Sequence, residues 1–347
     1  MSDIHIRRDG HAGRITLTRE HALNALTWDM VLAVERALDD WVNDPDITLL
    51  IIDAAGHKAF CAGGDIQELY DTGTAGDYSY CDRFWRDEYR MVAKLFNFPK
   101  PVVTFLQGFT MGGGVGLGCH GSHRVVCDGS TLSMPEVSIG LVPDVGGSLI
   151  LARAPGRLGE YIGLTADRMD AADAIHAGFA DYYIPHNVWP TLIETLCTAG
   201  NWDAIDAAAT RPPPSRLAAW QADIDAVFSG EAIGDIWRGM PDPLPDAIAH
   251  ARTLMLRNSP MAQHAALVIL RKVRIVDTIE GALNYEFRAT SRAVEHGDFL
   301  EGIRAAIIDR DRSPKWRFAT WDTVSGGEIV RLGYPVNPPL DLTGDAP

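Results

Sequence analysis

Glycine-rich segments occur at points in the sequence where backbone N–H groups could bind a ligand. Residues 61–65, 112–114 and 143–147 each contain two or more consecutive glycines. Glycine lets the backbone approach a ligand closely, and residues 112–114 precede a predicted helix whose dipole would add positive charge there. Two such N–H groups could stabilise the oxyanion formed when a carbonyl is attacked, or bind a phosphate. Tight turns or close backbone packing would require the same glycines.

Acidic residues near these segments are candidates for acid or base chemistry. Glu136 follows Pro135 at a predicted helix start, and Asp144 comes eight residues later. Two neighbouring carboxyl groups can have separated pKa values, so that one acts as a base or nucleophile and the other as an acid. An N-terminal helical glutamate can also simply complement the helix dipole. Glu88, in a predicted helix, is a third candidate whose alternative is a solvated charged helix face.

Histidine and cysteine give weaker signals. Cys119, His123 and Cys127 recur at four-residue steps, but a helix end is predicted between them, so we expect no metal site. His120 and His123 lack a matching serine or cysteine nucleophile motif and are expected to be structural. The five cysteines contain no Cys-x-x-Cys pair, which argues against a disulfide framework and fits a reducing cytoplasm.

The elements that must position these residues alternate between strand and helix patterns. Apolar spacing predicts a helix over residues 28–41, and apolar runs predict buried strands at 47–52 and 102–106. Shorter strands are expected at 14–18 and 125–126. This alternation predicts an α/β fold in which loops at strand ends carry the site.

The second half of the chain has a more helical pattern. Three consecutive prolines at 212–214 predict a linker or boundary. We therefore expect an α/β core that carries the site over residues 1–200 and a mainly helical region over 201–347. The remaining elements expected are helices at 171–177, 261–273 and 279–287, and a strand at 182–184.

The charge of the chain limits its partners. The formal net charge is −15 and the isoelectric point is about 5.1, which argues against nucleic acid or an anionic membrane as a partner. No stretch of roughly 18 apolar residues is present, and residues 1–9 lack a signal-peptide pattern. We expect a cytoplasmic protein. A polyanionic ligand would need a local basic patch that the sequence does not locate.

Several motifs together resemble those of the crotonase, or enoyl-CoA hydratase/isomerase, superfamily. The resemblance implies an α/β fold, a crotonase-like spiral of ββα units with a mainly helical C-terminal region, and an acyl-CoA substrate. The order and spacing of the motifs agree from about residue 14 to residue 184. The matching segments are His-Ala-Leu-Asn-Ala-Leu at 21–26, Ala-Phe-Cys-Ala-Gly-Gly-Asp-Ile at 59–66, the glycines at 112–114, and Met-Pro-Glu at 134–136.

Further segments are similar to the 3-hydroxyisobutyryl-CoA hydrolase subfamily. They are residues 110–117, 140–147, 298–305 and 313–316. The similarity implies hydrolysis of a short branched hydroxyacyl-CoA thioester, namely 3-hydroxyisobutyryl-CoA to 3-hydroxyisobutyrate and CoA, as in valine catabolism. It implies no cofactor, because coenzyme A is part of the substrate, and a homo-oligomer, either a trimer or a hexamer.

The resemblance also assigns roles to individual residues. It implies that the backbone N–H groups of Gly64 and Gly113 donate to the oxyanion, and that Glu136 and Asp144 form an acid/base or nucleophilic pair. It also implies that Glu88 is a further site residue and that the backbone at Ala62 and Ile66 receives the CoA adenine.

One position separates the subfamilies. Similar hydratases have a second catalytic glutamate where this chain has Gly116, and usually glycine where it has Asp144. A hydratase must activate water and protonate the α-carbon, so hydrolysis is favoured when one carboxylate is missing. The alternatives are an enoyl-CoA hydratase or isomerase and a non-catalytic acyl-CoA-binding protein. Phosphoryl transfer is disfavoured, because residues 112–114 are not followed by the Lys-Ser/Thr of a P-loop.

Overall fold

The computed structural model describes residues 3–344, which form two compact units built from separate stretches of chain. The first, here called the sheet unit, comprises residues 3–64, 90–133 and 168–218. The second, the helical unit, comprises residues 65–89, 134–167 and 219–344. The boundary expected near residue 200 stays a prediction.

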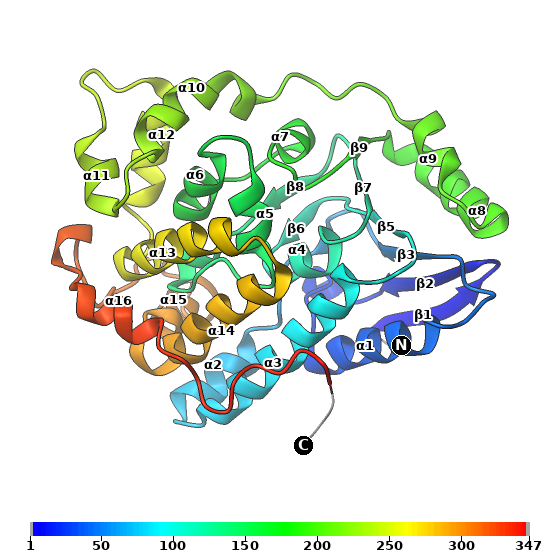
Figure 1. Ribbon diagram of the computed structural model, residues 1–347, viewed down its shortest axis with the longest axis horizontal. Helices are drawn as coiled ribbons and strands as arrows, with labels where there is room; N and C mark the ends of the chain where they lie inside the picture. Colours follow the sequence, from blue (N-terminus) through cyan, green and yellow to red (C-terminus); the bar gives the residue numbers. More distant parts are fainter. Residues whose placement is uncertain (1–2, 345–347) are drawn as a thin grey trace. The chain divides into compact units, whose positions relative to one another are not determined.

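The sheet unit contains a six-stranded sheet in the order β1-β2-β3-β5-β7-β9 and a three-stranded sheet in the order β4-β6-β8 (Figure 1). Strands β1 and β2 are antiparallel, and every other pairing is parallel. The strands are β1 Ile4–Asp9, β2 Ala12–Leu17, β3 Leu49–Ala54, β4 Ala59–Cys61, β5 Val102–Phe105, β6 Phe109–Met111, β7 His123–Val126, β8 Thr131–Ser133 and β9 Tyr182–Tyr183.

The apolar runs in the sequence correspond to the central strands. Five of the six residues of β3 are buried, as are all four of β5, because parallel strands are covered on both faces. The predicted α/β class and these strands are confirmed. The small sheet was not predicted, since its strands have only three residues each and are too short for a periodic pattern.

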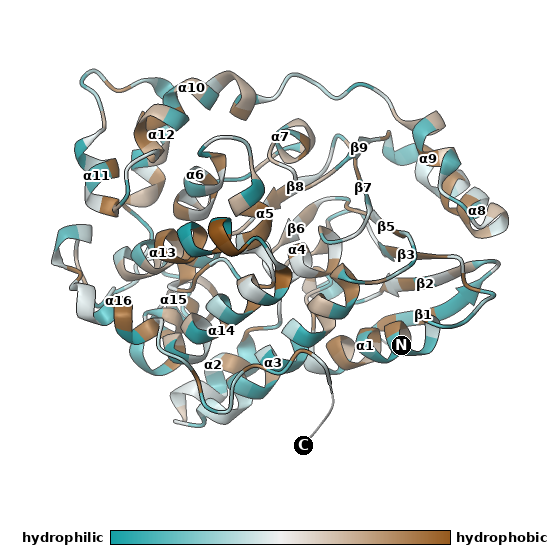
Figure 2. Cartoon of the chain, in the orientation of Figure 1, coloured by the Kyte–Doolittle hydropathy of each residue, from teal (hydrophilic) through white to brown (hydrophobic). Residues whose placement is uncertain are grey.

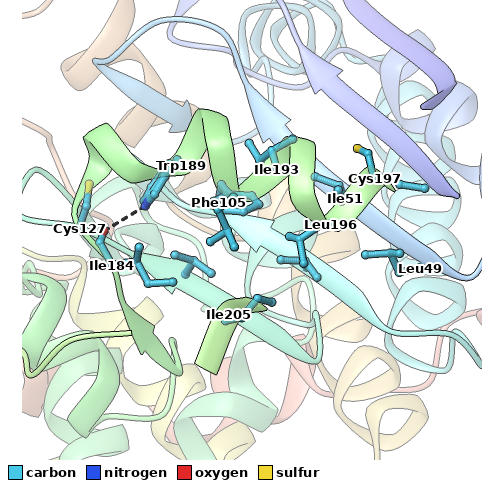
Figure 3. Packing of buried hydrophobic residues seen from close by; sticks show 14 residues of the cluster. Leu49, Ile51, Phe105, Cys127, Ile184, Trp189, Ile193, Leu196, Cys197 and Ile205 are labelled. Carbon is cyan, nitrogen blue, oxygen red and sulfur yellow. Dashed lines mark hydrogen bonds between the residues drawn. The ribbon is translucent and has the colours of Figure 1, made fainter. Parts of the chain in front are cut away.

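A hydrophobic cluster in the sheet unit joins the large sheet to a helix that covers it. Phe105 of β5 packs against Trp189 of α8 (Trp189–Ala199), with ring centroids 5.2 Å apart. The Trp189 indole N–H donates to the carbonyl of Ile184 at 3.0 Å, so burial of the ring leaves no polar atom unpaired (Figure 3). The same cluster includes Ile51 of β3 and Leu196 of α8.

Helices begin where the sequence supplies a cap. Thr27 accepts the N–H of Met30 and starts α1 (Trp28–Trp41), the helix predicted over the same residues. The other helices within the sheet unit are α4 Gly113–Gly118, α7 Ala171–His176, α8 and α9 Asp203–Ala208. Helices α3 Tyr78–Phe96 and α10 Arg216–Phe228 contribute residues to both units.

The helical unit is organised around α13 (Pro260–Val276) and α14 (Ile279–His296), whose helical pattern the sequence predicted. Ser259 caps α13 and Thr278 caps α14. Both helices carry hydrophobic and hydrophilic residues, as Figure 2 shows for α13. The remaining helices of this unit are α2 Gln67–Thr74, α5 Gly147–Arg153, α6 Leu158–Thr165, α11 Ile233–Arg238, α12 Asp246–Met255, α15 Phe299–Ile303 and α16 Gly326–Leu332.

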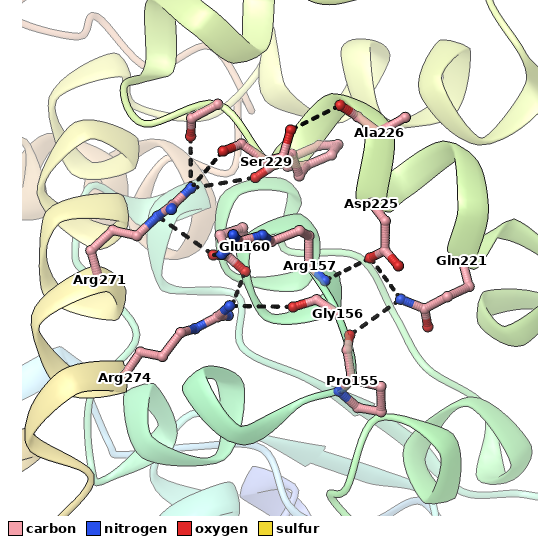
Figure 4. A network of polar contacts seen from close by, with 12 residues as sticks. Pro155, Gly156, Arg157, Glu160, Gln221, Asp225, Ala226, Ser229, Arg271 and Arg274 are labelled. Carbon is pink, nitrogen blue, oxygen red and sulfur yellow. Dashed lines mark hydrogen bonds and ion pairs between the residues drawn. The ribbon is translucent and has the colours of Figure 1, made fainter.

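A buried glutamate connects α6 to α13. The side chain of Glu160 is fully buried and lies 3.0 Å from Arg157, 2.8 Å from Arg274 and 3.5 Å from Arg271 (Figure 4). Arg271 also donates to the carbonyl of Gly230 at 2.7 Å. One carboxylate therefore balances three guanidinium groups between two helices and a loop.

Within residues 3–344, none of the helices has the length and hydropathy needed to cross a bilayer.

We expect the substitution Glu160→Gln to lower the free energy of unfolding by about 3 kcal/mol, because it leaves three partly buried cations without their counter-ion. Chemical unfolding followed by circular dichroism measures this change. The exposed Glu194 on α8 is the control, since Glu194→Gln should change stability by less than about 0.5 kcal/mol. Equal stability of both variants would contradict a structural role for the Glu160 ion pairs.

Candidate active site

In the sheet unit, two of the predicted glycine segments lie against each other. Gly63 adopts φ +118°, and a Cβ atom on it would be 3.4 Å from the Met111 carbonyl and 3.9 Å from the Gly113 nitrogen. Gly64 forms a parallel bridge with Leu26. The two glycines expected to donate to an oxyanion therefore belong to adjacent loops, at the ends of β4 and β6.

The glycine run at the start of α4 is required by backbone geometry. Gly112 has φ 49° and ψ −120°, a combination that side-chain-bearing residues rarely adopt. A Cβ atom on Gly114 would be 2.2 Å from the Cys61 carbonyl, so only glycine fits. Gly113 is the first residue of α4, and its N–H has no intrahelical acceptor. Its amide group is thus available to a ligand.

In the helical unit, the three predicted carboxyl groups are all buried. Glu88, Glu136 and Asp144 are 3%, 4% and 5% exposed. The alternative interpretation of Glu88 as part of a solvated helix face is therefore wrong, and the charge pattern of its helix gave no sign that this position faces inward. Burial, together with the nearby Asp144 charge, raises the pKa of Glu88 and of Glu136 well above the usual value.

Glu136 opens a 3₁₀ helix, Glu136–Ile139, where the sequence predicted a helix start. Its Oε2 atom has no hydrogen-bond partner among residues 3–344, although a buried carboxyl oxygen normally has one. Burial is the largest cause of its raised pKa, followed by the charges of Asp144, Glu286 and Glu88. An unpartnered oxygen on a group with a raised pKa is what a general base or nucleophile requires.

Asp144 lies in the third glycine-rich segment and is held by a tyrosine. The Tyr89 hydroxyl donates to Oδ2 of Asp144 at 2.8 Å. Burial raises the pKa of Asp144 to about 7, while the bond from Tyr89 opposes this rise by stabilising the ionised form. Asp144 can consequently exchange a proton near neutral pH.

The sequence did not reveal several residues that support these groups. Tyr89 follows Glu88 directly but carries no motif, and Glu286 lies within a helix predicted only from its apolar spacing. The C-terminal segment at 298–305 matched the family, but its purpose was not evident. A Cβ atom on Gly302 would be 2.1 Å from the Ile139 carbonyl, so this segment packs directly under the turn that carries Glu136.

Ala62 and Ile66, the positions expected near the CoA adenine, are partly buried. The Ala62 N–H donates to the Leu23 carbonyl at 3.0 Å, and Ile66 immediately precedes α2. The carboxylate of Asp65 accepts the N–H of Gln67 at 3.3 Å, although Ile66, and not Asp65, is the N-cap residue of α2. Binding of adenine at Ala62 and Ile66 stays a prediction.

A cavity of about 410 Å³ in the sheet unit adjoins the His-Ala-Leu-Asn-Ala-Leu motif. Asn24 is 1% exposed, and its side-chain amide donates to the carbonyls of Ala55 and Ala59 at 3.1 and 2.9 Å. These bonds hold Leu23 and Asn24 at positive φ values of 52° and 56°. The cavity is lined by Glu20, His21, Leu23, Asn24 and residues 55–59, with the side chains of His21, His57 and Lys58 exposed.

The histidines considered in the sequence pack against aromatic rings. His120 is 8% exposed and lies 5.7 Å from Phe96, and His123 stacks on Tyr182 at 6.0 Å between ring centroids. No three His, Cys, Asp or Glu side chains between residues 3 and 344 come together in a way that could hold a metal ion.

Comparison with known proteins identifies the family. The sequence profile described as enoyl-CoA hydratase/isomerase matches residues 12–332, and the chain belongs to this family of acyl-CoA enzymes. Among curated relatives, the chain is 33% identical to the mitochondrial 3-hydroxyisobutyryl-CoA hydrolase of Gallus gallus, over 93% of this chain and 86% of that protein. It is 32% identical to the human protein of the same name, over 94% and 87% of the two chains.

Solved structures confirm the crotonase-like α/β fold with its helical C-terminal region. An enoyl-CoA hydratase from Rhodobacter sphaeroides 2.4.1 is 48% identical, with a TM-score of 0.94 over 98% of this chain and 100% of that chain. A carnitinyl-CoA dehydratase from Mycobacterium thermoresistibile is 37% identical, with a TM-score of 0.95 over 99% and 100%. The relatives' names thus include both hydrolysis and hydration.

The Tyr89–Asp144 hydrogen bond can be tested directly. We expect Tyr89→Phe to raise the pKa of Asp144 above about 7, by about one pH unit, because the ionised carboxylate loses its donor. A carbon-13 NMR titration of aspartate-labelled protein measures this pKa.

A matched control exists in the same unit. Tyr161 is also fully buried and donates to Asp167 at 2.7 Å. Tyr161→Phe should leave the titration of Asp144 unchanged. If both variants shift Asp144 equally, the bond from Tyr89 is not what holds its pKa down.

Proposed function

We propose that this protein hydrolyses the thioester of a short branched hydroxyacyl-CoA, with 3-hydroxyisobutyryl-CoA as substrate and 3-hydroxyisobutyrate and free CoA as products. The observation that carries the proposal is a buried pair, Glu136 and Asp144, in a chain with no side chain at Gly116, where similar hydratases have glutamate. The identity of about 33% to curated 3-hydroxyisobutyryl-CoA hydrolases supports it.

The proposed reaction gives each predicted group a role. The N–H groups of Gly64 and Gly113 would donate to the thioester oxygen as it becomes an oxyanion, and removing one such donor typically costs about 2.7–4 kcal/mol of barrier lowering. Glu136 would either attack the carbonyl carbon, forming an anhydride that water then hydrolyses, or remove a proton from a water that attacks the carbonyl carbon directly. The carbon–sulfur bond breaks, a carbon–oxygen bond forms, and the CoA thiolate takes up a proton.

The other predicted site residues have accessory roles in this proposal. Asp144, with a pKa of about 7, would orient the substrate hydroxyl or help transfer a proton to the leaving thiolate. Glu88, whose pKa burial also raises, would be a neutral hydrogen-bond donor to the acyl group. Ala62 and Ile66 would contact the adenine through their backbone. No cofactor enters this proposal.

The cavity in the sheet unit offers a place for the CoA phosphates. Lys58, His21 and His57 are exposed on segments that line it, beside the exposed carboxylate of Glu20, in a chain whose net charge is −15. The Lys58 ammonium group would be the charged donor to an anion there, and screening limits the effect of more distant acidic groups to about 10 Å. We propose that phosphate groups of CoA bind along this rim. A role in valine catabolism and assembly into a trimer or hexamer are proposals from the family resemblance, and cytoplasmic location is a proposal from the cysteine pattern.

The role of Glu136 predicts the effect of removing its charge. Glu136→Gln should lower kcat at least about 100-fold while binding of the CoA ester persists, because the amide keeps the shape but cannot act as a base or nucleophile. Release of free thiol from 3-hydroxyisobutyryl-CoA measures turnover, and calorimetry measures binding. The exposed Glu280→Gln is the control and should retain full activity. Turnover by Glu136→Gln within threefold of wild type would remove Glu136 from the mechanism.

The second candidate function is hydration of an enoyl-CoA, favoured by the 48% identity to the enoyl-CoA hydratase from Rhodobacter sphaeroides 2.4.1. Hydration needs a proton donor near the α-carbon as well as a base for water, and Gly116 has no side chain for either task. Hydrolysis needs only attack at the carbonyl, an oxyanion hole and release of a thiol.

The two activities can be compared on one preparation. We expect kcat/KM for thiol release from 3-hydroxyisobutyryl-CoA to exceed kcat/KM for hydration of crotonyl-CoA at least about 100-fold, or about 2.7 kcal/mol in barrier. Thiol release and loss of enoyl absorbance are followed in parallel. Faster hydration would replace the hydrolase proposal, and binding of both esters without turnover would favour a non-catalytic acyl-CoA-binding protein.

A further inference from the structure

A buried glutamate outside every family motif lies against the loop of Asp144. Glu286, in α14, is fully buried. Its Oε2 atom accepts the N–H of Gly146 at 2.8 Å, and its Oε1 atom accepts the N–H of Ser148 at 3.0 Å. The Ser148 hydroxyl also contacts Oε1. A single carboxyl group therefore engages three polar groups of a loop that is about 140 residues away in the sequence.

The loop that Glu286 engages has an unfavourable backbone. Val145 has φ +53° and is 1% exposed, and the next residue, Gly146, has φ +75°. A β-branched residue at positive φ is strained and persists only where its surroundings impose that conformation. Glu286 binds the N–H groups directly after this strained residue, so it supplies part of that constraint.

The same bonds satisfy the start of α5. Gly146 is the N-cap residue of α5 and, as a glycine, has no side chain that could cap the helix. The first N–H groups of a helix lack intrahelical acceptors and are costly to bury without a partner. Glu286 provides these acceptors from another helix. Because Asp144 precedes Gly146 by two residues, the position of its backbone depends on this contact.

Helix α14 supports the other side of Asp144 as well. Thr290, one turn beyond Glu286, lies 3.3 Å from the Tyr89 hydroxyl, which donates to Asp144. Phe287 contacts the Tyr89 ring edge-to-face at 6.1 Å between centroids. One face of α14 thus contacts both the loop that carries Asp144 and the tyrosine that binds its carboxyl group.

We propose that Glu286 is a positioning residue, whose carboxyl group fixes the loop at 144–148 against α14 and thereby keeps Asp144 in contact with Tyr89. The expected effect on turnover rests on the proposed function, because it assumes that Asp144 takes part in the reaction. The expected effect on the position of the loop does not. Burial raises the pKa of Glu286 to about 8, while the hydrogen bonds from Ser148 and Gly146 oppose this rise.

The test is hydrogen exchange by mass spectrometry on the full chain, together with kinetics. In Glu286→Gln, the side chain keeps its shape but has one acceptor oxygen, so its NH2 group must face one of two backbone N–H donors. We expect exchange of the amides at 143–149 to accelerate at least about tenfold. We also expect kcat to fall at least about tenfold with KM within threefold, because a misplaced Asp144 affects the reacting complex.

Two further variants make the result specific. Glu160→Gln removes an equally buried carboxylate of the same unit, and should lower stability without changing exchange at 143–149 or kcat. Ser148→Ala keeps both backbone bonds to Glu286 and loses only the hydroxyl contact, so exchange should accelerate about two- to fivefold. If Glu286→Gln does not fold, hydrogen exchange in Ser148→Ala tests the proposal instead.

The outcomes separate the two proposals. Unchanged exchange at 143–149 in both Glu286→Gln and Ser148→Ala would overturn the positioning role, as would a change in KM alone. An equal acceleration in Glu160→Gln would also overturn it, since the effect would then be general loss of stability. A third outcome is faster exchange at 143–149 in Glu286→Gln together with a wild-type protein that releases no thiol from any acyl-CoA. This outcome would contradict the proposed function and support the structural role of Glu286.

Discussion

Burial of several carboxyl groups in one unit is the constraint on which the candidate site depends. Glu88, Glu136, Asp144 and Glu286 are each at most 5% exposed, and burial is the main cause of the raised pKa of every one of them. Desolvating a charged carboxylate costs several kcal/mol unless donors replace water. The helical unit supplies such donors to Asp144 and Glu286, but leaves Oε2 of Glu136 without one among residues 3–344. That oxygen belongs to the carboxyl group that is proposed to react.

The two kinds of chemistry are divided between the two units. The sheet unit holds the paired glycine loops, whose conformations at Gly112 and Gly114 exclude other residues. The helical unit holds the carboxyl groups. The chain passes from the first unit to the second directly after Gly64, and again after Ser133, three residues before Glu136. The first of these crossings lies within the motif at 59–66, and the second lies directly before the motif at 134–136.

In the proposed function, the position of one carboxyl group distinguishes hydrolysis from hydration. Relatives named as hydrolases and as hydratases share the fold of this chain, so the fold alone does not select between them. Compared with the pattern expected for hydratases, this chain lacks a carboxyl group at Gly116 in α4 and has one at Asp144, which is buried in the loop before α5. The addition requires support that a glycine at this position would not need, and Tyr89 and Glu286 provide it.

The sequence by itself determined the helices α1, α13 and α14, the buried strands β3 and β5, the glycine loops and the family, because these depend on local periodicity, caps and short motifs. Tertiary structure alone decided that Glu88 is buried, that Gly302 packs under Ile139, and that Glu286 binds a loop about 140 residues away. Spacing along one helix shows which residues share a face, but not which distant segment covers that face. The strands of the small sheet were missed for a related reason: with three residues each, they exist only through pairing with one another.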